Sequence, residues 1–381
     1  FERRINNHTT RRQGIVVLQN QITYNMNKLL MVIGILLSSF AYAGVHTYTD
    51  QSVLNNGHFV KISVSETGVH MITYEQLKSW GIEPAQLRIF GYGGGMLSEN
   101  FMLHHWDDLP SVAFYMHKGA DGVFNAGDFV LFYAQGPITW QSDKQGRWRH
   151  TINPYSNYGY YFLSDDAGEQ RVIEEKHFEA TSDIINVDWY TNYQVHEIDE
   201  VNLIDLTGVN GGGREFYGEM LNESNKTLSV DFHSPNVRTD LTMYCYIDMA
   251  GITSAPTTVA VNIAGQKNNC TIPAIDVSDY YTKAEQDSLW MVVNATNNIK
   301  QTVSLSFNNS ASGAKVYLNY IEINIPCQLK MQGNTLAISN ITQLGASSSI
   351  RFNMTGANTQ TQIWRVTDGV NIEQMPTTWS N

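Results

Sequence analysis

Cysteine is scarce in this chain of 381 residues, which contains only Cys245, Cys270 and Cys327. An odd and sparse set does not build the disulfide framework that stabilises small secreted domains. Cys245 lies in an alternating strand pattern, which predicts a position in the core. One disulfide remains open in an oxidising compartment, although nothing in the sequence favours it.

Positive charge is also in short supply, with 24 Lys and Arg residues against 36 Asp and Glu residues. Without the first 43 residues, 19 positive side chains stand against 35 negative ones, and the net charge is −16. An acidic surface of this size repels nucleic-acid phosphates and anionic lipid headgroups. The sequence therefore predicts no nucleic-acid partner.

Apolar runs long enough to cross a membrane are missing. The longest run, Leu29–Phe40, has about a dozen residues, whereas a bilayer-spanning helix needs about 20. Lys28 places a positive charge before it, and Ala41 and Ala43 are small residues at the two positions that a signal peptidase recognises. These features predict a signal peptide that is cleaved between Ala43 and Gly44. The alternative is a short buried helix.

The predicted leader divides the chain. Residues 26–43 form the signal peptide, and residues 1–25, which are basic and unpatterned, are interpreted as an upstream segment outside the native protein. The mature chain is then expected to be soluble and exported to the periplasm, the outer membrane or the cell surface.

Abundant aromatic and β-branched residues, with Gly and Asn between them, predict an all-β fold. Residues 44–180 are predicted to form a mixed β domain with one short helix, which the capping box Thr73–Gln76 begins. Residues 181–335 are predicted to form a β-sandwich or jelly-roll domain. Residues 336–381 are interpreted as further strands that stop abruptly, as expected for a piece of a longer protein. Beyond residue 200, strand-like runs occur at 228–232, 241–247, 258–263, 302–307, 316–323 and 350–352.

Three short motifs resemble binding sites but lack residues that binding requires. Gly91–Gly95 has neither the Gly-Lys-Ser/Thr of a phosphate loop nor a third dinucleotide-loop glycine, and its glycines are interpreted as positive-φ turns. His104–Asp108 has no further His at metal-ligand spacing. Asp121–Asp128 lacks the bidentate Glu of a calcium loop and is interpreted as a turn, with weak Ca²⁺ binding left open. We therefore predict no metal site and no cofactor.

No catalytic residue is predicted either. A cysteine nucleophile needs an imidazole nearby to form its thiolate, and no His lies within a few residues of any of the three cysteines. The G-x-S-x-G motif of a serine hydrolase is also absent.

Aromatic side chains gather between residues 140 and 161. Trp140, Trp148 and Tyr155 form a candidate interaction surface, since such rings stack on sugars or on a partner chain. Burial in the core is the commoner fate of aromatic residues in a β domain.

Three longer stretches resemble a known family: Gly57–Tyr74, Ile89–Gly95 and Val123–Pro137. Shorter similar stretches follow at residues 153–156, 160–162, 213–219, 317–321 and 363–368. Together they resemble the N-terminal region of the type IX secretion sortases of Bacteroidetes, which are gingipain-family cysteine peptidases. The resemblance extends over residues 55–370.

The resemblance implies an exported protein that removes C-terminal sorting domains from secreted cargo and helps attach that cargo to the cell surface. The implied partners are outer-membrane components of the type IX system, the cargo sorting domains and the protein's own C-terminal peptidase domain. Residues 336–381 would lead to that domain, which holds the family's catalytic Cys and His. No catalytic residue is therefore carried over to this chain.

A second hypothesis is a cell-surface β-sandwich adhesin or glycan-binding module that uses the aromatic residues. The coding sequence after Asn381 discriminates between the two, because only the sortase requires a Cys/His peptidase domain there.

Overall fold

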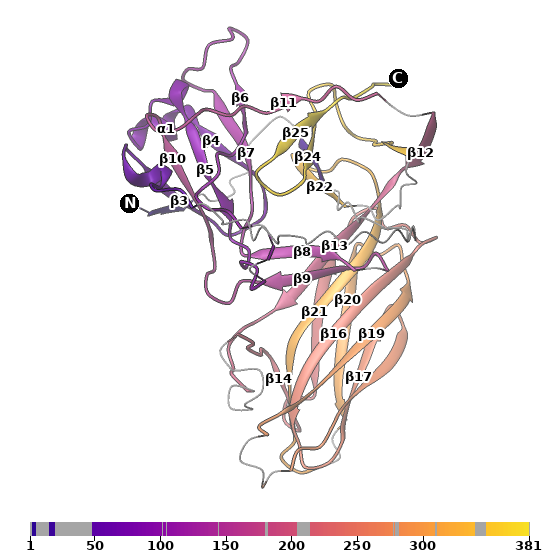
Figure 1. The fold of residues 1–381 in the computed structure, drawn as a ribbon. Helices are drawn as coiled ribbons and strands as arrows, with labels where there is room; N and C mark the ends of the chain where they lie inside the picture. The colour runs from indigo at the N-terminus through magenta and orange to yellow at the C-terminus, as the bar shows by residue number, and fades with distance from the viewer. Residues whose placement is uncertain are drawn as a thin grey trace, which may run out of the picture.

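The protein folds almost entirely as short strands (Figure 1). The computed structural model describes residues 2–4, 15–19, 48–100, 102–103, 105–143, 145–179, 182–203, 214–276, 278, 282–308, 311–339 and 348–380. In these ranges helix is confined to α1 and two single turns of 3-10 helix, which confirms the all-β prediction. No helix there combines the length and apolar composition needed to cross a membrane. The predicted cleavage residues Ala41, Ala43 and Gly44 lie outside the described residues.

The N-terminal region consists of two small sheets around one core. One sheet has the order β1-β3-β10-β5 and the other β4-β7-β6. Their facing sides bury Ile62, Ile72, Phe114, Phe132 and Tyr161, all inaccessible to solvent. The elements are β1 (Glu2–Arg4), η1 (Val53–Asn55), β3 (Val60–Val64), β4 (Gly68–Thr73), α1 (Tyr74–Ser79), η2 (Pro84–Gln86), β5 (Arg88–Gly93), β6 (Phe114–His117), β7 (Phe129–Ala134) and β10 (Gly159–Ser164).

Helix α1 begins where the capping box predicts. The Thr73 hydroxyl accepts the backbone N–H of Gln76, and the Gln76 side chain accepts the backbone N–H of Thr73. This exchange satisfies two backbone donors that the first turn leaves without a helical partner. Leu77 is the buried residue that holds the helix on the sheet.

The glycines of Gly91–Gly95 lie in and just after strand β5: the predicted positive φ is confirmed at Gly91 and Gly93, but both lie in a strand, so their placement in a turn is wrong. Gly91 and Gly93 have φ of 149° and 98°, and the β10–β5 register shifts between Tyr160 and Phe162. A bulge of this kind needs a residue without a side chain. A Cβ on Gly91 would also come within 2.6 Å of the Tyr161 ring.

The middle of the chain forms two sheets packed face to face, the long strands in the lower half of Figure 1. Alternating residues of both sheets fill the core between them, as in a β-sandwich. The first sheet has the order β13-β21-β16-β19, with β14 paired to β21, and the second β15-β20-β17-β18. Their bounds are β13 (Trp189–Glu197), β14 (Met220–Leu221), β15 (Thr227–His233), β16 (Thr242–Ile252), β17 (Thr257–Ile263), β18 (Gln266–Ile272), β19 (Glu285–Asn294), β20 (Lys300–Asn308) and β21 (Lys315–Gln328).

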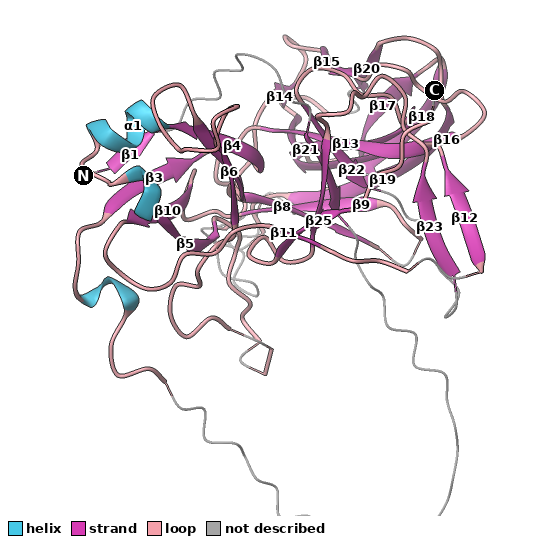
Figure 2. Ribbon diagram, turned by 90° about the horizontal axis from the view of Figure 1, so that it is seen from above, coloured by secondary structure: helices cyan, strands magenta, loops and turns pink. Residues whose placement is uncertain are grey.

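The last strands turn back onto the N-terminal region. Strands β24 (Gln362–Val366) and β25 (Ile372–Met375) form a hairpin, and its Trp364, Val366 and Ile372 pack against Leu131 and Tyr133 of β7. Strand β7 is therefore covered on both faces. Further strands are β2 (Ile15–Gln19), β11 (Glu174–Glu175), β12 (Asp183–Val187), β22 (Thr335–Ser339) and β23 (Ser348–Phe352). Figure 2 shows β12 and β23 side by side as a parallel pair.

Candidate functional site

The main polar centre of the described residues lies where the hairpin β8 (Ile138–Ser142) and β9 (Trp148–Ile152) crosses the sandwich (Figure 1). Side chains alternate along β21, so Ile321 and Ile323 face the sandwich core while Glu322 and Asn324 face outward. Glu322 is nevertheless 0% exposed and Asn324 2% exposed. The hairpin covers this outer face and removes both side chains from water.

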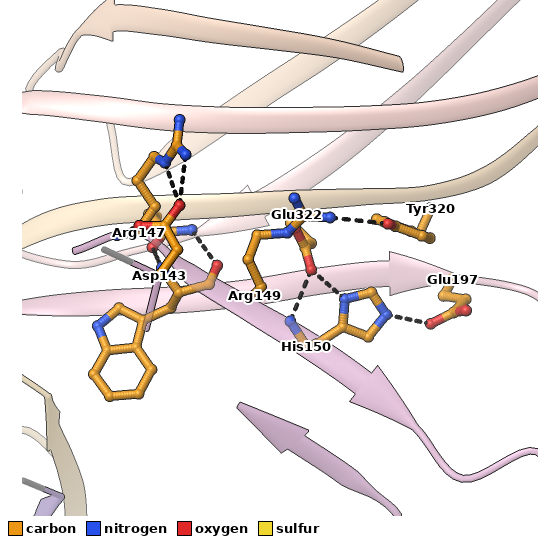
Figure 3. A network of polar contacts seen from close by, with 9 residues as sticks. Asp143, Arg147, Arg149, His150, Glu197, Tyr320 and Glu322 are labelled. Atoms are coloured by element: carbon orange, nitrogen blue, oxygen red, sulfur yellow. Dashed lines mark hydrogen bonds and ion pairs between the residues drawn. The ribbon is translucent and has the colours of Figure 1, made fainter. Parts of the chain in front are cut away.

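Glu322 is the centre of a buried charge network (Figure 3). Its Oε1 accepts the backbone N–H of His150 at 2.8 Å and lies 2.5 Å from His150 Nδ1. The other ring nitrogen, Nε2, lies 2.6 Å from Glu197 Oε2. Arg149 Nε lies 2.5 Å from Glu322 Oε2, an ion pair whose geometry is not that of a hydrogen bond. Two positive side chains of the hairpin are thus matched by two carboxylates of the sandwich.

Aromatic rings of the sandwich hold the two arginines of the hairpin. The Arg149 guanidinium lies 3.8 Å from the centre of the Tyr246 ring and donates from Nη2 to the Tyr320 hydroxyl at 2.9 Å. Arg147 lies 3.9 Å from the centre of the Trp290 ring. Guanidinium groups over aromatic faces keep a favourable electrostatic contact after losing water. The hairpin is therefore held by planar stacking as well as by charge.

Asn324 binds the hairpin backbone directly. Its Oδ1 accepts the N–H of Trp148 at 2.6 Å, and its Nδ2 donates to the carbonyl of Trp148 at 3.0 Å. One amide side chain thus makes both bonds that a neighbouring strand residue would make. Because Asn324 and Trp148 are both buried, losing either bond would leave an unsatisfied polar group.

The three predicted interaction residues differ in how much of each side chain is exposed to solvent. Trp148 is 1% exposed, and Trp140 is half-buried; both rings contact Tyr193, at centroid distances of 5.0 and 4.5 Å. Tyr155 is 68% exposed, and its hydroxyl accepts a hydrogen bond from Arg214. Both tryptophans of the hairpin therefore pack on Tyr193 of the sandwich, whereas the Tyr155 ring is exposed to solvent.

His150 is positively charged at neutral pH. Burial acts to lower its pKa, but hydrogen bonds and charge attraction from Glu197 and Glu322 outweigh burial and raise the pKa to about 9. An imidazolium fixed between two carboxylates has no free nitrogen to accept a proton. His150 therefore acts in this geometry as a structural cation and not as a general base.

The stability of the docked hairpin is expected to fall in mild alkali. The pKa of His150 rises from its ordinary 6.5 to about 9, so its contribution is complete below pH 6.5 and is lost as pH rises through 9. The urea midpoint should decrease between about pH 7 and about pH 9.5. Burial raises the pKa of the neighbouring Asp199 to about 6, and its contribution changes below this window.

The matched control for this pH dependence is His150→Gln, which keeps polarity but cannot be charged. Its midpoint should be lower at pH 7 and nearly independent of pH across the same window. An equally steep alkaline loss in both proteins would show that another group titrates.

The cysteines do not form a reaction centre. Cys245, Cys270 and Cys327 are free and buried, which confirms the predicted core position of Cys245. Burial raises the pKa of all three thiols, to about 12 for Cys327. A thiol in this environment is neither ionised at neutral pH nor accessible to substrate.

The other sequence motifs make turns and caps. Asp108 accepts the Ser52 hydroxyl at 2.7 Å and the backbone N–H of Val53, which fixes the 3-10 turn η1. Asp121 and Asp128 accept the backbone N–H groups of Val123 and Asn125. Nowhere in the described ranges do three or more His, Cys, Asp or Glu side chains gather in a way that could hold a metal ion.

Sequence reasoning missed the four charged residues of the network: Arg149, His150, Glu197 and Glu322. A signal was present in residues 317–325, where polar and aromatic residues alternate with Leu and Ile. Such alternation predicts a solvated outer face. Only the tertiary arrangement shows that a hairpin from residues 138–152 covers it.

The fold and this centre define an all-β scaffold whose buried charges join two parts of the chain. No protein-family model and no curated protein matches the sequence. The chain is similar to the solved structure of dimeric latent PorU from Porphyromonas gingivalis, with a TM-score of 0.73 and 25% identity. The match covers 88% of this chain and 30% of the PorU chain, so this sequence spans about a third of that protein.

Carbohydrate-binding modules are also among the similar structures. The CBM36-1 domain of a xylanase from the hindgut metagenome of Trinervitermes trinervoides matches at 14% identity, over 35% of this chain and 96% of its own, with a TM-score of 0.21. A family 35 module from Clostridium thermocellum matches at 12% identity, over 34% and 90%, also with a TM-score of 0.21. These scores are too low to support any functional inference.

Proposed function

We propose that this chain is the non-catalytic N-terminal part of a type IX secretion sortase. The whole protein would remove C-terminal sorting domains from secreted cargo and help attach the cargo to the cell surface. The observation that carries the proposal is the similarity to PorU over 88% of the chain. Translocon components in the outer membrane, cargo sorting domains and the protein's own peptidase domain are the partners that this function requires.

The role proposed for this part is mechanical. A scaffold that positions a peptidase needs a fixed relation between its domains, and the buried network of Glu322 supports such a relation. A buried charge network is weak evidence for stability but is well suited to fixing one arrangement among several. The proposed domain plan is residues 44–180, 181–335 and 336–381, with the peptidase following and residues 26–43 acting as the leader.

Deleting the codons for residues 48–380 from the parent gene tests the function. Cargo proteins should then keep their C-terminal sorting domains and fail to appear on the cell surface, as seen by mass spectrometry of cell fractions. The remaining peptidase part should be measured by immunoblot, so that its loss is not mistaken for loss of positioning. Normal removal of sorting domains in the deletion strain would refute the proposal.

The mature fragment, residues 44–381, is expected to leave sorting-domain peptides intact, because its three thiols are buried and protonated. Incubation with a fluorogenic peptide should give no signal above buffer, while the full-length parent cleaves the same peptide. Turnover by the fragment that iodoacetamide stops would contradict this expectation.

The glycan-binding alternative receives no comparable support. Trp148 is buried, so it cannot stack on a sugar. The Trp140 ring already contacts the rings of Tyr193 and His150. Tyr155 is the exposed member of the three.

A further inference from the structure

Strand β22 pairs with β2, a strand from near the start of this sequence. In the sheet of order β11-β25-β24-β2-β22, strand β2 lies between β22 and β24 and runs parallel to both. Val17 of β2 is opposite Ala337 on one side and Trp364 on the other. Within the described residues β22 pairs with no other strand. Without β2, a gap of one strand would separate β22 from β24.

Buried side chains anchor both walls of this gap. In β22, Ile338 and Ser339 are each 1% exposed, and Ile338 belongs to the sandwich core. In β24, Trp364 is 0% exposed and packs with Leu131 and Tyr133 of the N-terminal region, while Ile363 packs against the sandwich core. The walls therefore cannot move together to pair with each other unless one of them leaves its core. The gap would stay open at about 9.5 Å, twice the normal strand spacing.

The strand that fills the gap here is not expected in the exported protein. Residues 15–19 precede the predicted signal peptide at residues 26–43, so export would remove them. Two rows of backbone N–H and C=O groups would then lack partners. An open strand edge of this kind invites pairing with another strand.

We propose that in the exported protein this gap accepts an extended segment of the same polypeptide from beyond residue 381, parallel to β22 and β24. This inference rests on the proposed function, in which a peptidase domain follows. The match covers 30% of the solved PorU chain, so most of a protein of that length lies outside this sequence. A strand tethered to the groove has an effective concentration near the millimolar range, which a separate chain rarely reaches.

The occupant's chemistry follows from the groove. It must be extended and free of proline, because every backbone group faces a wall that needs a partner. Residues 15–19, Ile-Val-Val-Leu-Gln, give the pattern: four apolar residues, three of them β-branched, and no charge. A strand of this composition, exposed in solution, would aggregate, so a permanent place inside the protein also protects it.

Photo-crosslinking in the full-length exported protein tests the proposal. A benzophenone side chain replaces Ala337, which is exposed on β22, and a control protein carries it at the exposed Asn268 of β18. The expected product joins residue 337 to a residue beyond 381 of the same chain. The control should give no such product. A crosslink from residue 337 to cargo, to a second copy or to nothing would overturn the proposed occupant.

Hydrogen exchange gives a second measurement on the unmodified full-length protein. Amides of residues 335–339 and 362–366 should exchange at least ~100-fold more slowly than those of exposed loops. A synthetic peptide of residues 13–21 should not bind, because the groove is filled. Fast exchange together with peptide binding would show an empty groove and overturn the proposal. Cargo cleavage is assayed separately, so an occupied groove without sortase activity would refute the proposed function alone.

Discussion

Replacing Glu322 with alanine is expected to lower the free energy of unfolding by about 3–5 kcal/mol. Glu322 is fully buried and pairs with both Arg149 and His150. Removing Glu322 takes away the carboxylate that Arg149 and His150 share. Glu197 remains nearby, but it pairs with His150 and not with Arg149. Urea unfolding followed by tryptophan fluorescence measures the loss, since Trp140 and Trp148 lie in this hairpin.

The matched control is Asp231→Ala, which breaks an ion pair with Lys300 at the surface of the sandwich. Exposed pairs of this kind contribute about 0–1 kcal/mol. The variant Glu322→Gln separates charge from shape, because it fills the same space and can still accept from the His150 N–H. If Glu322→Ala costs no more than Asp231→Ala, the network does not hold the hairpin in place.

Replacing Trp364 with alanine is expected to cost about 3–5 kcal/mol and to detach the β24–β25 hairpin from the N-terminal region. The Trp364 side chain is inaccessible to solvent and packs with Leu131 and Tyr133. Its removal leaves a large cavity between strands that are distant in the sequence. Hydrogen exchange should accelerate in residues 362–375 before it does in the sandwich.

Trp379→Ala is the control, because Trp379 is 49% exposed. A surface substitution of this kind usually changes stability by no more than about 0.5 kcal/mol. Equal effects of the two substitutions would mean that the hairpin contributes no packing energy to the N-terminal region.

Local signals in the sequence predicted much of the fold. The capping box fixed the start of α1, because its two hydrogen bonds join residues three positions apart. Alternation of apolar residues predicted β15, β16, β17, β20 and β21, since a period of two arises within each strand. Further strands were expected in residues 336–381, where β24 lies, and Asp368 accepts backbone N–H groups in the turn that follows it.

Contacts between distant segments could not be predicted in this way. The first four residues of β19, Glu285–Ser288, are all polar, and the apolar run that follows does not alternate with polar residues, so the strand pattern is weak until β19 pairs with β16. The unbroken apolar run Phe129–Ala134 indicates that both faces of β7 are covered. Nothing local indicated that the second cover comes from residues 362–375.

The candidate interaction surface shows the same limit. Trp140 and Trp148 lie in a hairpin with charged neighbours, a pattern that is equally typical of an exposed arm. Their burial depends on Tyr193 and Asn324. No feature within the hairpin specifies that partner. The interaction surface itself stays a prediction, with Tyr155 as its exposed member.

The separation between the hairpin and its docking strand has a consequence for biosynthesis. Trp148 and His150 bind residues 176 and 172 positions further along the chain. Because a polypeptide is synthesised from its N-terminus, Trp148 and His150 must wait for β21 before they find their partners. During that interval two tryptophans and two cations are exposed together, and such intermediates are prone to aggregate. A chaperone that holds the first half of the chain until β21 arrives would reduce this risk.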